Sequence, residues 1–234
     1  MKILFSLVAF FLLIQQAAAQ GVPKPIFVLA SDDIAQCQLF LYKHAGAPLT
    51  GFLRIGYSPG KNAEFTTIAA INPQKKFPLV INGKPFGEVD APILKKPSNF
   101  DLNITSPDDA FALAKTFVVS PTKPAAVLTQ NAEAPIFSLV PADVFKTVIT
   151  LSKDKTELET SFVKPRQIEF AATAASNLQK QGEIVLNGQT VGELTITKPT
   201  LGHSVSVEMP AADAAFAMAK ALMEQVPNSP PKTP

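Results

Sequence analysis

One pentapeptide matches the signature of a serine nucleophile. Gly56-Tyr57-Ser58-Pro59-Gly60 fits the G-x-S-x-G pattern. In that motif a strand, a sharp turn and a helix expose the serine, and the backbone N–H of the next residue helps to form the oxyanion hole. Here the next residue is Pro59, which has no N–H. The segment that follows, Glu64 to Ile71, predicts a strand rather than a helix. The pattern therefore predicts a turn over residues 58–62 and no hydrolase site.

Other residues that could carry chemistry are few. The two histidines, His44 and His203, do not occur at a metal-binding spacing. The carboxylate pairs Asp32-Asp33 and Asp108-Asp109 are explained by a turn and by the first turn of a helix. The sequence has no phosphate-binding loop, dinucleotide fingerprint or CxxC motif. We therefore predict that the protein is not an enzyme, with no catalytic residue, no metal site and no cofactor.

The cysteine and aromatic residues indicate core packing. A single cysteine, Cys37, excludes an internal disulfide, and its alternation with Leu39 and Leu41 predicts a buried thiol. The chain has 17 Phe, 2 Tyr and no Trp. Exposed platforms for sugars or nucleic acids favour aromatic residues with a polar group or a broad face. We therefore expect the phenylalanines to fill a core.

The first residues have the pattern of a signal peptide. Lys2 is followed by the apolar run from Ile3 to Ile14 and by the small residues Ala17-Ala18-Ala19. We expect residues 1–19 to be removed, so that the mature protein begins at Gln20 or Gly21 and is periplasmic or secreted. No later segment approaches the roughly 20 apolar residues of a membrane span.

The charge balance excludes some partner classes. The chain has 21 Lys and Arg against 19 Asp and Glu, and removal of Lys2 leaves 20 against 19, a net charge of +1. This balance has no electrostatic signature for nucleic acid, and no run of like charge indicates an anionic membrane surface. A protein partner in the cell envelope or in a host is the expectation that remains.

Two distant stretches of the chain repeat each other. Residues 79–89 return as residues 184–194, and residues 110–115 return as residues 215–220. Both pairs are separated by the same offset, since 187 − 82 = 105 and 216 − 111 = 105. A constant offset indicates a tandem duplication. Pro25-Ile26-Phe27 resembles Pro135-Ile136-Phe137 at an offset of 110, so the copies also differ by insertions.

Each copy predicts the same series of elements. Asn82-Gly83 and Asn187-Gly188, flanked by aliphatic residues, predict hairpin turns, and Gly87 and Gly192 predict a bulge or a close backbone approach in each returning strand. A strand with one polar face and then a helix follow in each copy. Further strands are predicted over the ranges 36–44 and 49–58, and the pattern of 144–151 fits a strand or a helix.

These elements predict an α+β protein made of two homologous antiparallel β-sheet units. Each unit is expected to be sandwich-like and closed by a C-terminal helix. The predicted boundaries are a signal peptide (1–19), a first repeat (20–119), a linker (120–134), a second repeat (135–226) and a disordered Pro-rich tail (227–234).

Several features resemble the invasion-associated locus B family of bacterial periplasmic β-domains. They are the strand after Cys37, the run Leu49-Thr50-Gly51-Phe52-Leu53-Arg54, the hairpin on Ile81-Asn82-Gly83-Lys84 and the Asp-Asp-Ala-Phe helix start. The chain lacks the early Trp and the cysteine pair usual in that family. The resemblance implies no catalysis and an envelope or secreted protein that interacts with host cells.

The sequence therefore favours a non-catalytic binding or envelope-assembly protein. The alternatives are a host-interaction factor similar to the invasion-associated locus B family, or an enzyme with an unrecognised site between the repeats. The candidate partner-binding residues are the polar members of two alternating strands. They are Asn99, Asp101 and Asn103 in the first copy and Ser204, Ser206 and Glu208 in the second.

Overall fold

The structure is a computed structural model that describes residues 26–43, 48–71, 76–90, 99–104, 106–123, 134–198 and 202–224. Within these residues, strands and four helices form the α+β fold that the sequence predicts, with mainly antiparallel sheets. The predicted signal peptide, the Pro-rich tail and most of the predicted linker lie outside the described residues.

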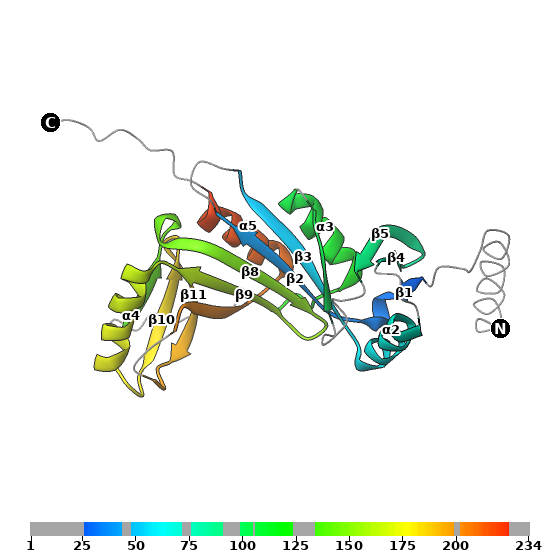
Figure 1. The fold of residues 1–234 in the computed structure, drawn as a ribbon. Helices are drawn as coiled ribbons and strands as arrows, with labels where there is room; N and C mark the ends of the chain where they lie inside the picture. Colours follow the sequence, from blue (N-terminus) through cyan, green and yellow to red (C-terminus); the bar gives the residue numbers. More distant parts are fainter. Residues whose placement is uncertain are drawn as a thin grey trace, which may run out of the picture. The chain divides into compact units, whose positions relative to one another are not determined.

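The two halves of the chain contain the same elements in the same order (Figure 1). The first half consists of β1 (Phe27–Leu29), η1 (Ser31–Asp33), β2 (Ile34–Tyr42), β3 (Thr50–Tyr57), α2 (Pro59–Ile71), β4 (Lys76–Ile81), β5 (Lys84–Asp90), β6 (Asn99–Leu102) and α3 (Pro107–Phe117). The second half consists of β7 (Ile136–Leu139), η3 (Pro141–Asp143), β8 (Val144–Ser152), β9 (Thr156–Phe162), α4 (Lys164–Ser176), β10 (Gln181–Leu186), β11 (Gln189–Thr195), β12 (Ser204–Met209) and α5 (Ala212–Met223).

The element boundaries locate the difference in length between the two halves. Strands β2 and β8 begin at Ile34 and Val144, and 144 − 34 = 110. Helices α2 and α4 begin at Pro59 and Lys164, and 164 − 59 = 105. The five-residue difference therefore lies in the connection after β2, which is longer in the first half than the connection between β8 and β9.

Both predicted hairpins are present. Asn82 and Asn187 each have a φ of 49°, and Gly83 and Gly188 have φ values of 78° and 79°. Positive φ at both central residues is the requirement of a type I′ turn, which Asn-Gly meets at low cost. The register of β4–β5 and of β10–β11 shifts once, beside Gly87 and Gly192, so the predicted bulges are confirmed.

The strand predicted over Glu64 to Ile71 is wrong, because these residues belong to α2. The run Thr66-Thr67-Ile68 has a high strand propensity, but packing overrides it. Phe65 is fully buried, and its ring stacks on that of Phe27 with 4.0 Å between centroids. The undecided segment 144–151 is a strand, β8.

By packing, the described chain forms two compact units. The first unit lies within Met1–Asp33 and Tyr57–Phe100. Its three-stranded sheet has the order β1-β4-β5, with β1 parallel to β4, so it is not purely antiparallel as expected. Helix α2 contributes Phe65 to a buried aromatic core with Phe27, Phe77 and Tyr57.

The second unit, Ile34–Gly56 and Asp101–Pro234, contains strands from both halves of the chain. Its main sheet has six strands in the order β12-β9-β8-β2-β3-β6. The order is palindromic, because each half contributes the equivalent three strands, and the halves meet where β2 pairs with β8 in antiparallel fashion. The sequence suggested a separate sheet for each copy. Instead, the copies share one. A second sheet, β11-β10-β7, packs with α4.

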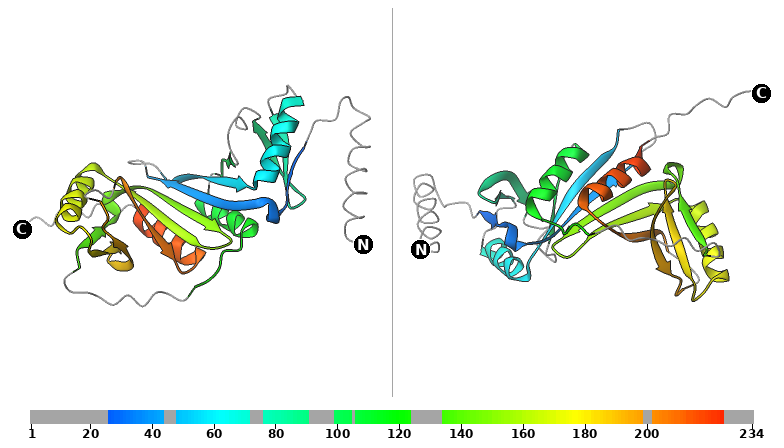
Figure 2. Two further views of the ribbon diagram at one scale, coloured as in Figure 1. Left: turned by 90° about the horizontal axis from the view of Figure 1, so that it is seen from below. Right: turned by 180° about the vertical axis from the view of Figure 1, so that it is seen from behind.

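Helices α3 and α5 cover one face of the six-stranded sheet. They lie behind the sheet in Figure 1 and in front of it in the right-hand view of Figure 2. The rings of Phe111 and Phe216 stack between the helices, with 4.1 Å between centroids. Two equivalent ion pairs join the helices, Lys115 to Asp213 at 2.6 Å and Lys220 to Asp108 at 3.1 Å. The repeated residues therefore form a two-fold-like contact.

Candidate functional site: the open face of the six-stranded sheet

The serine of the G-x-S-x-G motif precedes a helix. Ser58 lies between β3 and α2, so the motif occurs in a strand–turn–helix order. The sequence predicted a strand after the motif, and that prediction is wrong. The Ser58 hydroxyl accepts a hydrogen bond from the Lys61 N–H at 3.4 Å, and the Ser58 carbonyl accepts one from the Asn62 N–H at 3.0 Å. These are the bonds of a helix N-cap. Pro59 still offers no oxyanion donor.

The other chemically active side chains of the second unit have structural partners or are buried. His203 Nδ1 lies 2.9 Å from Gln167 Oε1, whereas His44 is outside the described residues. Cys37 is fully buried, as predicted, and burial raises the pKa of its thiol to about 12. Among the described residues, no group of three or more His, Cys, Asp or Glu side chains is arranged to hold a metal ion.

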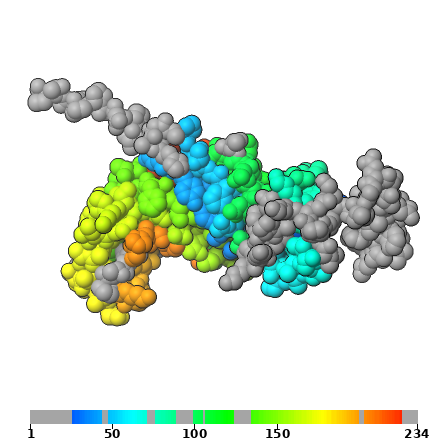
Figure 3. All heavy atoms as spheres, viewed as in Figure 1, coloured from blue at the N-terminus to red at the C-terminus, as the bar shows by residue number. Residues whose placement is uncertain are grey.

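The face of the six-stranded sheet opposite α3 and α5 is open, and it faces the viewer in Figure 3. Its side chains form three rows across β2, β8, β9 and β12, as the strand register shows. The rows are Tyr42–Lys146–Ser161–Ser204, Phe40–Val148–Glu159–Ser206 and Gln38–Thr150–Glu157–Glu208. The intervening rows, which include Leu39, Leu41 and Leu158, are buried on the helix side.

The half of the open face that the first copy forms is aromatic and cationic. Phe40 and Phe52 stack with 4.4 Å between centroids, and Tyr42 lies 6.0 Å from Phe52. The Arg54 guanidinium lies over both phenylalanine rings, 5.0 Å from Phe40 and 5.5 Å from Phe52. These side chains are all half-buried. We call Phe40, Tyr42, Phe52 and Arg54 the aromatic cluster.

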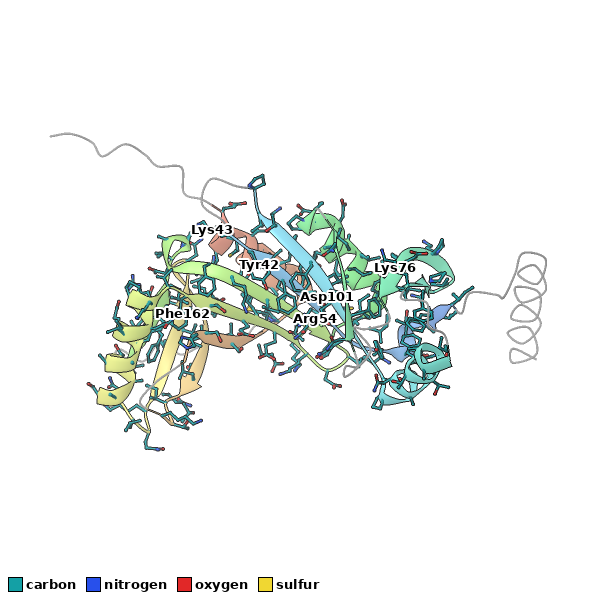
Figure 4. The ribbon with its side chains drawn as sticks, in the orientation of Figure 1. Tyr42, Lys43, Arg54, Lys76, Asp101 and Phe162 are labelled. Carbon is teal, nitrogen blue, oxygen red and sulfur yellow. The ribbon has the colours of Figure 1, made fainter. Side chains whose placement is uncertain are left out.

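Asp101 fixes the guanidinium of the aromatic cluster. Arg54 Nε and Nη2 donate to the two Asp101 carboxylate oxygens at 2.7 and 3.0 Å, a bidentate pair that Figure 4 shows on neighbouring strands. This hydrogen bonding raises the pKa of Arg54. Because both nitrogens are held, the plane of the guanidinium is fixed where it lies over the two rings.

A β-bulge in β8 carries an exposed aromatic ring. Val144 pairs with Phe162 and Lys146 with Ser161, so Phe145 is an extra residue in β8. Its side chain is 43% exposed, whereas most phenylalanines of the described chain are buried. Bulges commonly redirect a side chain. Lys146 lies next to it, with its ammonium 6.0 Å from the centroid of the Phe40 ring.

The equivalent half from the second copy has the opposite character. On the helix side, some equivalent residues are alike, such as Leu41 and Leu151 (offset 110) or Leu53 and Leu158 (offset 105). On the open face they differ. Phe40, Tyr42, Phe52 and Arg54 correspond to Thr150, Ser152, Glu157 and Glu159. At these four positions the first half is aromatic and cationic and the second carries hydroxyls and carboxylates, while the second half also carries Lys146 and Val148 on β8.

The predicted partner-binding residues lie at the two edges of this sheet. Asn99 and Asp101 are on edge strand β6, and Asn103 is exposed just beyond its end. Ser204, Ser206 and Glu208 are on edge strand β12, where each ends one of the three rows. Lys123 donates a hydrogen bond to Glu208, which lowers the pKa of that carboxyl. The two predicted groups share one face, although they are at opposite edges.

Sequence reasoning missed the centre of the face. The expectation that the phenylalanines fill the core fails for Phe40, Phe52 and Phe145. A signal was present in the alternation, because Phe40 and Tyr42 are out of phase with Leu39 and Leu41, as Phe52 and Arg54 are with Leu53. An alignment of the two copies would have shown that the second copy has polar residues at the positions of the aromatic cluster.

Comparisons with known proteins provide no family. No protein-family model matches the chain, and no curated protein matches it. One solved structure, described as the crystal structure of SecDF in a super-membrane-facing form, is similar to 94% of this chain at 15% identity and a TM-score of 0.34. The chain spans 32% of the length of that SecDF chain. This likeness is too low to establish a common fold. Within the described residues, no helix is both long and apolar enough to cross a membrane.

Proposed function

We propose that this protein is a non-catalytic binding or assembly protein of the cell envelope or of the secreted fraction. Its binding surface is the open face of the six-stranded sheet. The N-terminal signal pattern supports the location. The resemblance to the invasion-associated locus B family stays a hypothesis, because no family model matches the chain.

The observation that carries this proposal is the position of the aromatic cluster. It lies on the open face of the sheet, where no helix packs and folding does not require apolar side chains. The open face of an antiparallel sheet is usually polar. Aromatic residues and arginine are enriched in protein interfaces, where flat, rigid side chains provide contact area at a small entropy cost. Cross-strand aromatic pairs also stabilise a sheet. That contribution explains Phe40 and Phe52, but not the 43% exposure of Phe145 on a bulge.

Site-specific photo-cross-linking tests the proposal. A benzophenone amino acid at position 38, in the middle of the open face, is compared with the same group at the exposed position 175 on α4. We expect protein adducts from position 38 in the producing cells and few from position 175. The double substitution Phe40→Ser and Phe52→Ser should reduce the adducts from position 38. Equal adducts from both positions, or none from position 38, contradict the proposal.

A further inference from the structure

Helix α5 ends at the same end of the sheet as the aromatic cluster. The Lys43 ammonium donates to the carbonyl oxygens of Pro141 at 3.2 Å and of Glu224, the residue that follows α5, at 3.5 Å. Lys43 directly follows Tyr42, which is the last residue of β2 and a member of the aromatic cluster (Figure 4). Residues 225–234, which we call the C-terminal segment, therefore begin close to the cluster.

The C-terminal segment is rich in proline. After Val226 it reads Pro-Asn-Ser-Pro-Pro-Lys-Thr-Pro, with prolines at positions 227, 230, 231 and 234. Such a sequence favours the polyproline II helix, which has three residues per turn and no internal hydrogen bonds, so its carbonyl groups are free to accept. Proteins that recognise this helix place aromatic rings against the prolines.

The aromatic cluster offers both rings and hydrogen-bond donors. Phe40 and Phe52 stack, and Tyr42 lies 6.0 Å from Phe52, so the three rings form one strip beside Arg54. Asp101 accepts from two of the five N–H donors of the guanidinium, at Nε and Nη2, and Nη1 is left to donate elsewhere. The Tyr42 hydroxyl is a further donor.

From this geometry we propose that the aromatic cluster is the docking site of the chain's own C-terminal segment. The inference rests on the proposed function, since it names a regulator of the same surface. The proline rings of the docked segment lie on Tyr42, Phe40 and Phe52, and its backbone carbonyls accept hydrogen bonds from Arg54. A partner of the open face must displace the segment, so the segment competes with that partner.

Length and position both favour this occupant. The segment has 234 − 224 = 10 residues, which span about 31 Å as a polyproline II helix. Packed layers are about 10 Å apart and Phe40 is about 10 Å along β2 from Lys43, so the path is on the order of 20–25 Å. The connection 124–133 fits less well. It has one proline, and it follows Lys123, which pairs with Glu208 at the opposite edge of the face.

A single tryptophan reports whether the segment docks. The chain has no Trp, so Phe52→Trp introduces one indole into the aromatic cluster. The serine variant of the segment keeps its length and charge and combines Pro227→Ser, Pro230→Ser, Pro231→Ser and Pro234→Ser. We expect the indole emission to move to longer wavelength in the serine variant, because water then replaces the segment. The control, Asn228→Ser with Thr233→Ser, keeps the prolines and should leave the emission unchanged. If Phe52→Trp fails to fold, Tyr42→Trp is the second reporter.

A peptide of residues 225–234 tests the site itself. Added to the serine variant, it should return the emission to shorter wavelength in a saturable way. The concentration required should be on the order of millimolar, because a short flexible linkage supplies an effective concentration of that order. Tyr42→Ser should weaken peptide binding several-fold. Ser206→Ala, on the same face but on the distant strand β12, should not.

The outcomes separate the docking from the proposed function. Equal emission with the natural and the serine segment overturns the inference, as does a difference that the peptide does not reverse. A difference that grows with protein concentration also overturns it, because the segment then binds a second copy.

Cross-linking from position 38 provides the separate readout for the proposed function. If the segment competes with a partner, the serine variant should give several-fold more adducts from this position. If the emission does not respond to the segment while position 38 still forms adducts, the proposed function stands and only the docking is wrong. If the segment docks and position 38 forms no adducts even in the serine variant, the docking stands and the proposed function is wrong.

Discussion

At the scale of single residues, burial controls the chemistry of Cys37. Its thiol has a pKa of about 12 in the folded chain, raised by burial from an ordinary value of 9.0. The unfolded chain therefore releases this proton at lower pH than the folded chain. The stability due to the neutral thiol is complete below about pH 9 and is lost as the pH rises toward 12.

Replacement of Cys37 by valine should therefore reduce alkaline sensitivity. Thermal unfolding of the wild type and of Cys37→Val is compared at neutral pH and at several values above pH 9. We expect the wild type to lose more melting temperature over this range than the variant. Parallel curves would show that Cys37 does not contribute to the loss of stability at alkaline pH.

The native Cys37 thiol should also react slowly with a disulfide reagent at pH 8 and quickly after unfolding.

Ser58 acts, in our interpretation, as a helix cap, and its substitution should affect stability rather than activity. Loss of a serine N-cap costs about 0.5–2 kcal/mol. Ser58→Ala should lower the free energy of unfolding by that amount in urea titrations. Val163, the equivalent residue before α4, provides no side-chain cap, so Val163→Ser is the reciprocal variant and should stabilise. An esterase activity that disappears in Ser58→Ala would contradict the purely structural role.

At the scale of elements, the second copy carries polar groups inside its sheet. Thr147 and Thr160 are buried directly opposite each other on β8 and β9, and neither hydroxyl has a hydrogen-bond partner within the described chain. An unpartnered buried hydroxyl costs about 1–3 kcal/mol. Thr160→Val should therefore raise the free energy of unfolding by about 1 kcal/mol or more. The reverse change at the equivalent position of the first copy, Ile55→Thr, should lower it. A destabilised Thr160→Val variant would show that the hydroxyl is satisfied.

The contact between α3 and α5 should depend on its stacked rings and little on its ion pairs. Truncation of a buried phenylalanine costs about 3–5 kcal/mol, so Phe111→Ala and Phe216→Ala should each destabilise strongly. A double-mutant cycle should give a coupling of about 0.5–1.5 kcal/mol between the rings. The ion pairs are exposed, so Lys115→Ala should change stability by less than about 1 kcal/mol. Additive phenylalanine effects would contradict the stacking.

At the scale of the whole molecule, the shared sheet makes the two halves depend on each other. We expect the chain to stay assembled after cleavage at a protease site inserted between residues 130 and 131. The fragments should co-elute in native buffer and separate in denaturant, because strands β2 and β8 remain paired and α3 still packs on α5. The cut chain with Phe111→Ala and Phe216→Ala should dissociate more easily. Separate elution of the wild-type fragments would contradict a shared core.

The sequence by itself determined the features that depend on near neighbours. Asn-Gly specifies a positive φ at two successive residues, so both hairpin tips were predictable. Alternation and helical spacing predicted β12, α3 and α5, and the 105-residue offset predicted that the two halves contain equivalent elements. The segment around Glu64 to Ile71 was not predictable, because its strand-favouring residues become helical only through the packing of Phe65 against Phe27 and Tyr57.

Only the tertiary structure decided how the copies combine and where the candidate site lies. The pairing of β2 with β8 joins residues about 110 positions apart, and no local pattern specifies such a partner. The same pairing places Phe40 beside Lys146, while the position of β3 brings Phe52 and Arg54 to Phe40. Period-two alternation shows that a strand has two different faces. Which of them stays open depends on where helices from distant parts of the chain pack, because their apolar sides must be buried somewhere.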